Sequence, residues 1–110
     1  MDSITLHPIG EIRLKKPRLS IAYDLIASWS SDPPHAHIGR LAAAAIGICA
    51  ENYPFARYDT DQARPIAYGG KILDELIGKG VPPNAVVENG IKILTFLAPL
   101  IFKEEDTEKK

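Results

Sequence analysis

The sequence predicts a mainly α-helical (all-α) protein of about four helices, with a short extended or hairpin arm at its N-terminus. Four segments place their apolar residues at helical spacing, and only residues 4–14 alternate between apolar and polar as a strand does. Proline and glycine clusters separate the segments. We therefore divide the chain into an extended arm over residues 1–16, a helical domain over residues 17–103 and a charged, flexible tail over residues 104–110.

The arm and the first helix meet at Pro17. Within the arm, apolar and polar residues alternate on both sides of Pro8-Ile9-Gly10, which indicates a short hairpin or an extended segment. Because a two-stranded hairpin is marginal on its own, it should dock on the helices or on a neighbouring subunit. Proline suits the first helical position, so the first helix is expected to run from Pro17 to Ser30. Its apolar face is formed by Leu19, Ala22, Leu25, Ile26 and Trp29.

The second helix is expected over about residues 34–52, with Ser31 or Asp32 as its N-cap. The small side chains of Ala42–Ala45 would let another helix approach closely. Its expected buried face consists of Ile38, Leu41, Ala42, Ala45, Ile48 and Cys49. Residues 53–65 show no sustained period and are expected to form a loop. The aromatic residues of that loop, which we expect to pack on the helices, are Tyr53, Phe55 and Tyr58.

The third helix is expected over residues 65–79 and ends at a glycine. Gly80 is placed to stop the helix in a left-handed conformation, with Val81 folding back on Leu76. The Gly69-Gly70 pair lies on the apolar side, where it indicates close contact with another backbone. The apolar face is formed by Ile66, Leu73, Leu76 and Ile77.

The fourth helix, expected over residues 85–103, is too apolar for an ordinary surface helix. In the range 91–102 only Lys92 and Thr95 carry polar side chains. A helix that is apolar on most of its circumference must be buried on several sides. A chain of 110 residues has a limited core, so the surplus predicts a surface for self-association or for a partner.

The candidate interaction residues of this helix form two sets. One set, at near-helical spacing, is Val86, Ile93, Leu97 and Leu100. The other, in neighbouring directions, is Val87, Ile91, Leu94 and Phe102. One set could face the core and the other a partner; alternatively, this helix is the central helix of a monomeric bundle, packed by the other three. Asn84 is expected to cap the helix, and Pro99 to kink or end it.

The charge balance and the length of the apolar runs limit the classes of partner. Thirteen basic against 14 acidic residues give a net charge of −1, which disfavours nucleic acid. The third and fourth helices superficially resemble a helix-turn-helix, but residues 85–88 are apolar and acidic where a recognition helix needs polar and basic residues. The apolar run over residues 91–102 is well short of the roughly 20 residues of a membrane span, and the N-terminus lacks a signal-peptide layout. We expect a soluble cytoplasmic protein that binds neither nucleic acid nor membrane.

No residue pattern indicates an enzyme, a cofactor site or a metal centre. No Cys and no acidic cluster at ligand spacing completes a metal site with His35-Ala36-His37, which we expect in an exposed loop. Asp59-Thr60-Asp61 resembles the start of a calcium loop, but the glycine and the final glutamate are missing. Gly69-Gly70-Lys71 lacks the spacing of a phosphate loop. The single cysteine, Cys49, cannot form an intramolecular disulfide and is expected to be buried and unreactive.

Two segments carry a resemblance to a known group of proteins. Ala67–Val81, AYGGKILDELIGKGV, followed by a proline and another apolar helix, resembles small proteins encoded in tail modules of bacteriophages and prophages, called tail assembly chaperones. Arg40–Cys49, RLAAAAIGIC, is similar to their alanine-rich second helix. The resemblance covers about residues 18–102, and the N-terminal arm does not match it. It implies an all-helical, cytoplasmic, non-enzymatic protein that coats the tape-measure protein and recruits tail-tube subunits.

The sequence therefore favours a non-enzymatic phage tail assembly factor that binds tape-measure protein, tail-tube protein or both, and that forms a homo-oligomer. The alternative is another small protein-binding module of phage or bacterial origin, such as an inhibitor of host defence or a regulatory subunit. An enzyme or a nucleic-acid binder is the least favoured class. A tube-protein gene upstream and a long tape-measure gene downstream would favour the first class.

Overall fold

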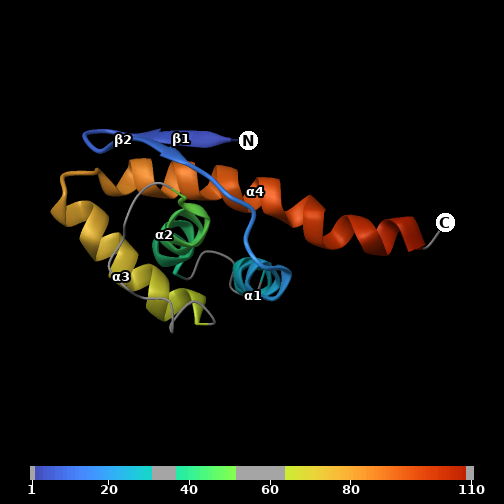
Figure 1. The fold of residues 1–110 in the computed structure, drawn as a ribbon. Helices are drawn as coiled ribbons and strands as arrows, with labels where there is room; N and C mark the ends of the chain where they lie inside the picture. Colours follow the sequence, from blue (N-terminus) through green and yellow to red (C-terminus); the bar gives the residue numbers. More distant parts are fainter. Residues whose placement is uncertain (1, 31–36, 52–63, 109–110) are drawn as a thin grey trace.

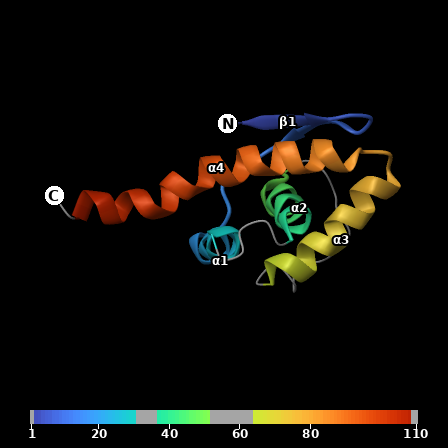
Figure 2. The ribbon, with the colours of Figure 1, turned by 180° about the vertical axis from the view of Figure 1, so that it is seen from behind.

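The fold is a computed structural model that describes the backbone of residues 2–30, 37–51 and 64–108, and side chains as far as residue 99 (Figure 1). Within these ranges a two-stranded hairpin precedes four helices, as the sequence predicts. The elements are β1 (Ser3–Leu6), β2 (Gly10–Arg13), α1 (Leu19–Ser30), α2 (Ile38–Cys49), α3 (Pro65–Gly78) and α4 (Pro83–Glu108). The hairpin lies along α4, and the C-terminal part of α4 extends beyond the other elements in both views (Figures 1 and 2).

The N-terminal arm is a hairpin that docks on the helices. Antiparallel pairing places Ile4 opposite Ile12, and both side chains are buried together with that of Leu6. The alternating residues Thr5 and Glu11 are exposed on the outer face. β1 contacts α4, so the hairpin gains from the helices the apolar cover that two strands alone do not have.

α2 is the central helix of the fold. The six consecutive residues 41–46 are all buried, as are Ile48 and Cys49, so α2 is covered on most of its circumference. It packs against α3 and α4 over most of its length and also contacts α1. Leu41, Ala42, Ala45, Ile48 and Cys49 of the expected face are buried, and the buried surface extends beyond that face to Ala43, Ala44 and Ile46. The other helix considered for a central place, α4, also contacts the three other helices and β1. Four consecutive alanines add little bulk, which lets several neighbours surround one helix.

Two glycines mark the places where α3 and α4 cross α2. A Cβ atom added to Gly69 would overlap the backbone carbonyl of Arg40, and one added to Gly90 would overlap the backbone of Ala42. These contacts confirm the close approach expected along the alanine run and at Gly69. Gly70, the other half of the predicted pair, lies beside the Arg40 side chain, with 3.7 Å between the added Cβ and Nε.

The end of α3 is the glycine stop that the sequence predicts. Gly80 has a φ of 94°, a left-handed conformation that favours glycine. Its backbone N–H donates to the Ile77 carbonyl, and that of Val81 donates to the Leu76 carbonyl, each at 3.0 Å. This pair of hydrogen bonds is the Schellman motif, and Val81 and Leu76 are both buried in the core.

The buried faces of α1 and α3 differ from those expected. Leu19, in α1, is 58% exposed, and Ile77, in α3, is 43% exposed. The contact between Gly69 and α2 sets the rotation of α3, because residues three or four positions from Gly69 then also face α2. The buried residues of α3 are accordingly Pro65, Tyr68, Gly69, Ile72 and Leu76.

The starts of three helices also differ from those expected. α1 begins at Leu19 rather than Pro17, and the first-turn hydrogen bond runs from the Ala22 N–H to the Arg18 carbonyl. α2 begins at Ile38, after a left-handed residue with a φ of 59°, rather than at residue 34. α4 begins at Pro83, because proline suits a first helical position, and its expected cap lies inside the helix. The expected cap residues of α2 and α4 are Ser31, Asp32 and Asn84, of which the first two lie outside the described residues.

α4 continues through Pro99 and past residue 103 to Glu108, so Pro99 does not end it. Proline removes one N–H donor from the helix, and the backbone stays helical on both sides of it. His35 and the aromatic residues expected to pack from the 53–65 loop lie outside the described residues.

Candidate functional site

Most of the apolar side chains of α4 that the sequence singles out for a partner are buried or half-buried within the chain. Val86, Ile93, Leu94 and Leu97 are buried within the chain, and Val87 and Ile91 are half-buried. Val86, Ile93 and Leu97 of the first predicted set therefore face the core, and Leu94 of the second set also faces it. The remaining candidates are Leu100 and Phe102, whose side chains lie outside the described part. The interaction role of these residues stays a prediction.

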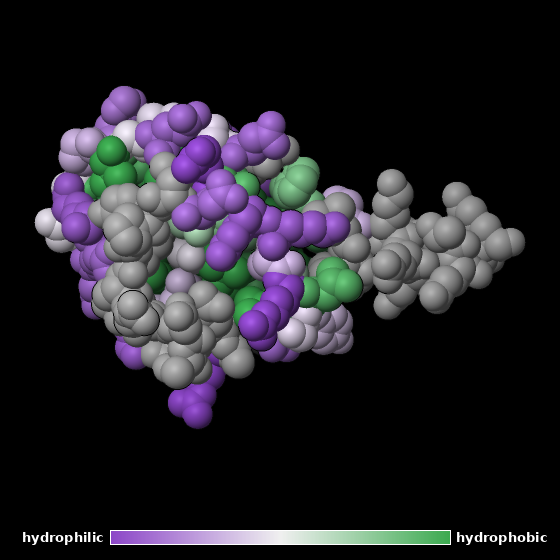
Figure 3. Space-filling model, in the orientation of Figure 1, coloured by the Kyte–Doolittle hydropathy of each residue, from purple (hydrophilic) through white to green (hydrophobic). Residues whose placement is uncertain are grey.

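A different residue of α4 is available to a partner. Phe96 is 44% exposed, and the other large apolar side chains exposed among the described residues are Leu19, Tyr23 and Ile77. Figure 3 shows hydrophilic residues over much of one face of the molecule, with hydrophobic residues visible between them. Single exposed apolar residues are ordinary on protein surfaces. Phe96 differs because it borders a cavity.

The cavity has a volume of about 290 Å³ and lies between the N-terminal arm, the end of α2 and the middle of α4. We call it the arm cleft. Leu14, Cys49, Ile93, Phe96 and Leu97 supply its apolar surface. Its charged lining residues are Asp2, Lys15 and Lys16. The apolar walls and charged edges are the composition of a binding site for an apolar group.

The wall formed by the arm is fixed to α2 by backbone pairing. α2 ends at Cys49, and the extended backbone of the next residue, Ala50, forms a β-bridge with Leu14. The Lys15 N–H donates to the Cys49 carbonyl at 2.7 Å, and the Leu14 N–H donates to the Asp2 carbonyl at 2.9 Å. The chain that leaves β2 is thus held against the C-terminus of α2, which gives the arm cleft one rigid side.

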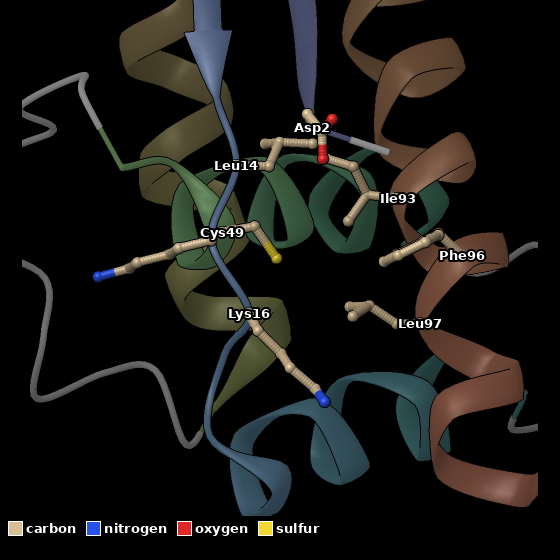
Figure 4. A pocket seen from close by; sticks show the side chains of 8 residues that line it. Asp2, Leu14, Lys16, Cys49, Ile93, Phe96 and Leu97 are labelled. Carbon is tan, nitrogen blue, oxygen red and sulfur yellow. The ribbon is translucent and has the colours of Figure 1, made fainter.

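The opposite wall is one face of α4. Ile93, Phe96 and Leu97 are spaced three and four residues apart, so their side chains lie on neighbouring turns of the same face. In Figure 4 the Phe96 and Leu97 side chains point from α4 toward the Cys49 sulfur across the arm cleft. Phe96 combines this position with partial exposure, whereas Ile93 and Leu97 are buried.

Two of the three charged lining residues of the arm cleft lie at its ends, and the third, Lys15, is hydrogen-bonded through its backbone N–H to Cys49. Figure 4 shows Asp2 at the end next to β1 and Lys16 at the end next to α1. Burial raises the pKa of the Cys49 thiol from 9.0 to about 12, against a smaller lowering by the Lys15 ammonium. The thiol is therefore neutral at physiological pH. The expected burial of Cys49 is confirmed, and its low reactivity stays a prediction.

Among residues 2–30, 37–51 and 64–108, no three His, Cys, Asp or Glu side chains gather where they could hold a metal ion. Within the same ranges, no helix combines the length and the apolar character needed to cross a membrane.

Sequence reasoning missed the arm cleft because its lining residues are far apart in the chain. Asp2, Leu14 and Lys16 come from the arm, while Cys49 and Phe96 come from two different helices. Phe96 belongs to the apolar run that the sequence singled out, but periodicity alone did not separate it from its buried neighbours. The signal that would have found it is its position, one residue before Leu97, at the edge of the buried stripe that runs through Ile93 and Leu97.

Comparisons with known proteins supply no relative for this chain. Family models, curated proteins and solved structures all return no match to it.

Proposed function

We propose that this protein is a non-enzymatic assembly factor of the phage tail assembly chaperone kind, acting in the cytoplasm of the bacterial host. In this proposal it binds tape-measure protein, tail-tube protein or both. The observation that carries the protein-binding role is Phe96, an aromatic side chain that is 44% exposed at the edge of the arm cleft.

The composition of the arm cleft supports a protein partner. Aromatic side chains beside an apolar pocket act as anchors in protein interfaces, and charged residues form the rim around them. Here Phe96 stands beside the buried Leu97, and Lys16 and Asp2 lie at the ends. A volume of about 290 Å³ is at the lower limit of small-molecule pockets, which span roughly 300–1,000 Å³. It suits one large side chain of a partner.

The assignment to tail assembly rests on the resemblance of two segments. Arg40–Cys49 lies within α2, and Ala67–Val81 covers most of α3 and its glycine stop. A host-defence inhibitor or a regulatory module would use the same exposed aromatic residue, so the identity of the bound protein distinguishes these functions. Self-association, the other expectation from the sequence, is measured separately by light scattering.

The first test is whether neighbouring genes encode a tail-tube and a tape-measure protein, and the second is co-purification of this protein with those two products. Phe96→Asp should lose the partner, whereas Tyr23→Asp, at an exposed position of α1 outside the arm cleft, should keep it. Burying one aromatic side chain contributes about 1.5–3 kcal/mol, so the affinity should fall about tenfold or more. Circular dichroism checks that both variants are folded.

Two outcomes would count against the proposal. If Phe96→Asp and Tyr23→Asp retain the partner equally, the arm cleft is not the binding site. If neither tail protein co-purifies while a host enzyme or regulator does, the protein belongs to the alternative class.

A further inference from the structure

We infer that the arm cleft binds a segment of a partner protein in one orientation. The segment places one large apolar side chain in the arm cleft, with acidic residues at the Lys16 end and no acidic residues at the Asp2 end. This inference rests on the proposed protein-binding function and adds the chemistry of the segment that is bound. It follows from the asymmetric placement of charge around the apolar walls.

The first step is the apolar centre. Cys49, Phe96 and Leu97 point toward one another across the arm cleft, and the Cys49 thiol is neutral because burial raises its pKa. A charged side chain placed between these groups would lose its hydration, and the charged lining residue nearest to Cys49 in the backbone pairing, Lys15, is itself exposed to solvent. The centre therefore selects an apolar side chain, and Phe96 offers an aromatic face for it to pack on.

The second step is the basic end. Lys16 lies at the end of the arm cleft next to α1 and belongs to the run Lys15-Lys16-Pro17-Arg18, which has three cations in four residues. All three cationic residues are exposed. Neither Lys16 nor Asp2 forms an ion pair with another of the described residues. An acidic partner residue at this end gains attraction without breaking an existing pair.

The third step is the acidic end. Asp2 lies at the opposite end, beside β1, and repels an acidic residue there. A segment with acids on one side of its apolar anchor is thus favoured in one direction and disfavoured in the reverse one. Repulsion at the wrong end contributes to specificity as directly as attraction at the right end does.

A displayed library of random peptides tests the inference, with the folded full-length chain as bait. Peptides enriched by the wild type should share one large apolar residue with acidic residues on one constant side. Selection on Lys16→Glu should lose those acids or replace them with basic residues, and selection on Asp2→Lys should accept acids on both sides. Lys92→Glu, at an exposed position of α4 outside the arm cleft, makes the same charge change as Lys16→Glu and should leave the enriched pattern unchanged.

The binding affinity of one enriched peptide then measures the contribution of each charged residue. Its affinity for Lys16→Glu should fall by about tenfold relative to the wild type at low ionic strength, and the difference should shrink as salt is added. Phe96→Asp should abolish binding, while circular dichroism confirms that each variant is folded.

Several results would overturn the inference. They are a library without enrichment, enriched peptides with no constant acidic side, and a Lys16→Glu selection that matches the wild type. If the wild type is an oligomer that Phe96→Asp dissociates, a second copy occupies the arm cleft, and the inference is again wrong. If the tail proteins fail to co-purify, the proposed function is wrong but the inference about the arm cleft is unaffected, because the peptide selections measure the chemistry of the arm cleft independently.

Discussion

Gly90→Ala adds one methyl group at the point where α4 crosses α2. The three atoms nearest to the new Cβ all belong to Ala42, and two of them are backbone atoms, which cannot rotate away. All three lie well inside the 3.4–4 Å of ordinary van der Waals contact. The helices must therefore separate by on the order of 1 Å, and the buried side chains on both sides of the crossing lose part of their dispersion contacts.

The expected magnitude combines two effects of opposite sign. Overpacking a core costs about 1–3 kcal/mol, and a rigid backbone contact belongs near the upper end of that range. Alanine is favoured over glycine inside a helix by about 1 kcal/mol. The variant should therefore be destabilised by about 2 kcal/mol, which lowers the melting temperature of a domain of this size by roughly 8–16 °C.

Gly78→Ala is the matched control, because no atom lies within 4 Å of the position its Cβ would occupy. With the same change in chemistry and no clash, it should leave stability unchanged or raise it by up to about 1 kcal/mol. Urea unfolding followed by circular dichroism measures both variants. If Gly90→Ala is as stable as the wild type, the close crossing of α2 and α4 is wrong.

Three further predictions concern stability and reactivity. Gly80→Ala should lower the free energy of unfolding in urea by about 1 kcal/mol, because a φ of 94° is strained for alanine. An unchanged unfolding midpoint would show that Gly80 does not act as the helix stop. Ile72→Ala should lower the free energy of unfolding by about 2–5 kcal/mol because Ile72 is buried, and Ile77→Ala by no more than about 0.5 kcal/mol because Ile77 is exposed. The reverse order would show that Ile77 is on the buried face of α3, as the sequence predicts. Cys49 should resist thiol reagents near neutral pH. Because its pKa is 9.0 when unfolded and about 12 when folded, Cys49 should lower the stability as pH rises from 9.0 toward 12, and the fall in stability should be smaller in Cys49→Ala than in the wild type.

Local signals were predictable from the sequence, and rotations of helices were not. The stop at Gly80 depends on a few neighbouring residues, so the residue pattern was sufficient to place it. The buried face of α3 depends on how Gly69 meets α2, a contact between residues distant in the chain. Periodicity gives the width of an apolar stripe, but the neighbouring elements decide which of its edges is covered.

The central position of α2 shows a second limit of the pattern. An alanine-rich helix has a modest apolar volume, so the bulkier α4 was the stronger candidate for partner contacts. In the fold, small side chains let α3 and α4 approach α2 from different sides, and Val86, Ile93, Leu94 and Leu97 of α4 are buried in the core. The arm cleft lay beyond prediction for the same reason, because it exists only where the arm, α2 and α4 meet.

Site-specific photocrosslinking tests most directly whether the arm cleft binds the partner. A benzophenone amino acid replaces Phe96 in one variant and Tyr23 in another, and each variant is irradiated together with the tape-measure and tail-tube proteins. Position 96 should crosslink to one of these proteins through a segment with a large apolar residue, and position 23 should not. Crosslinks from position 23 without any from position 96 would contradict the account.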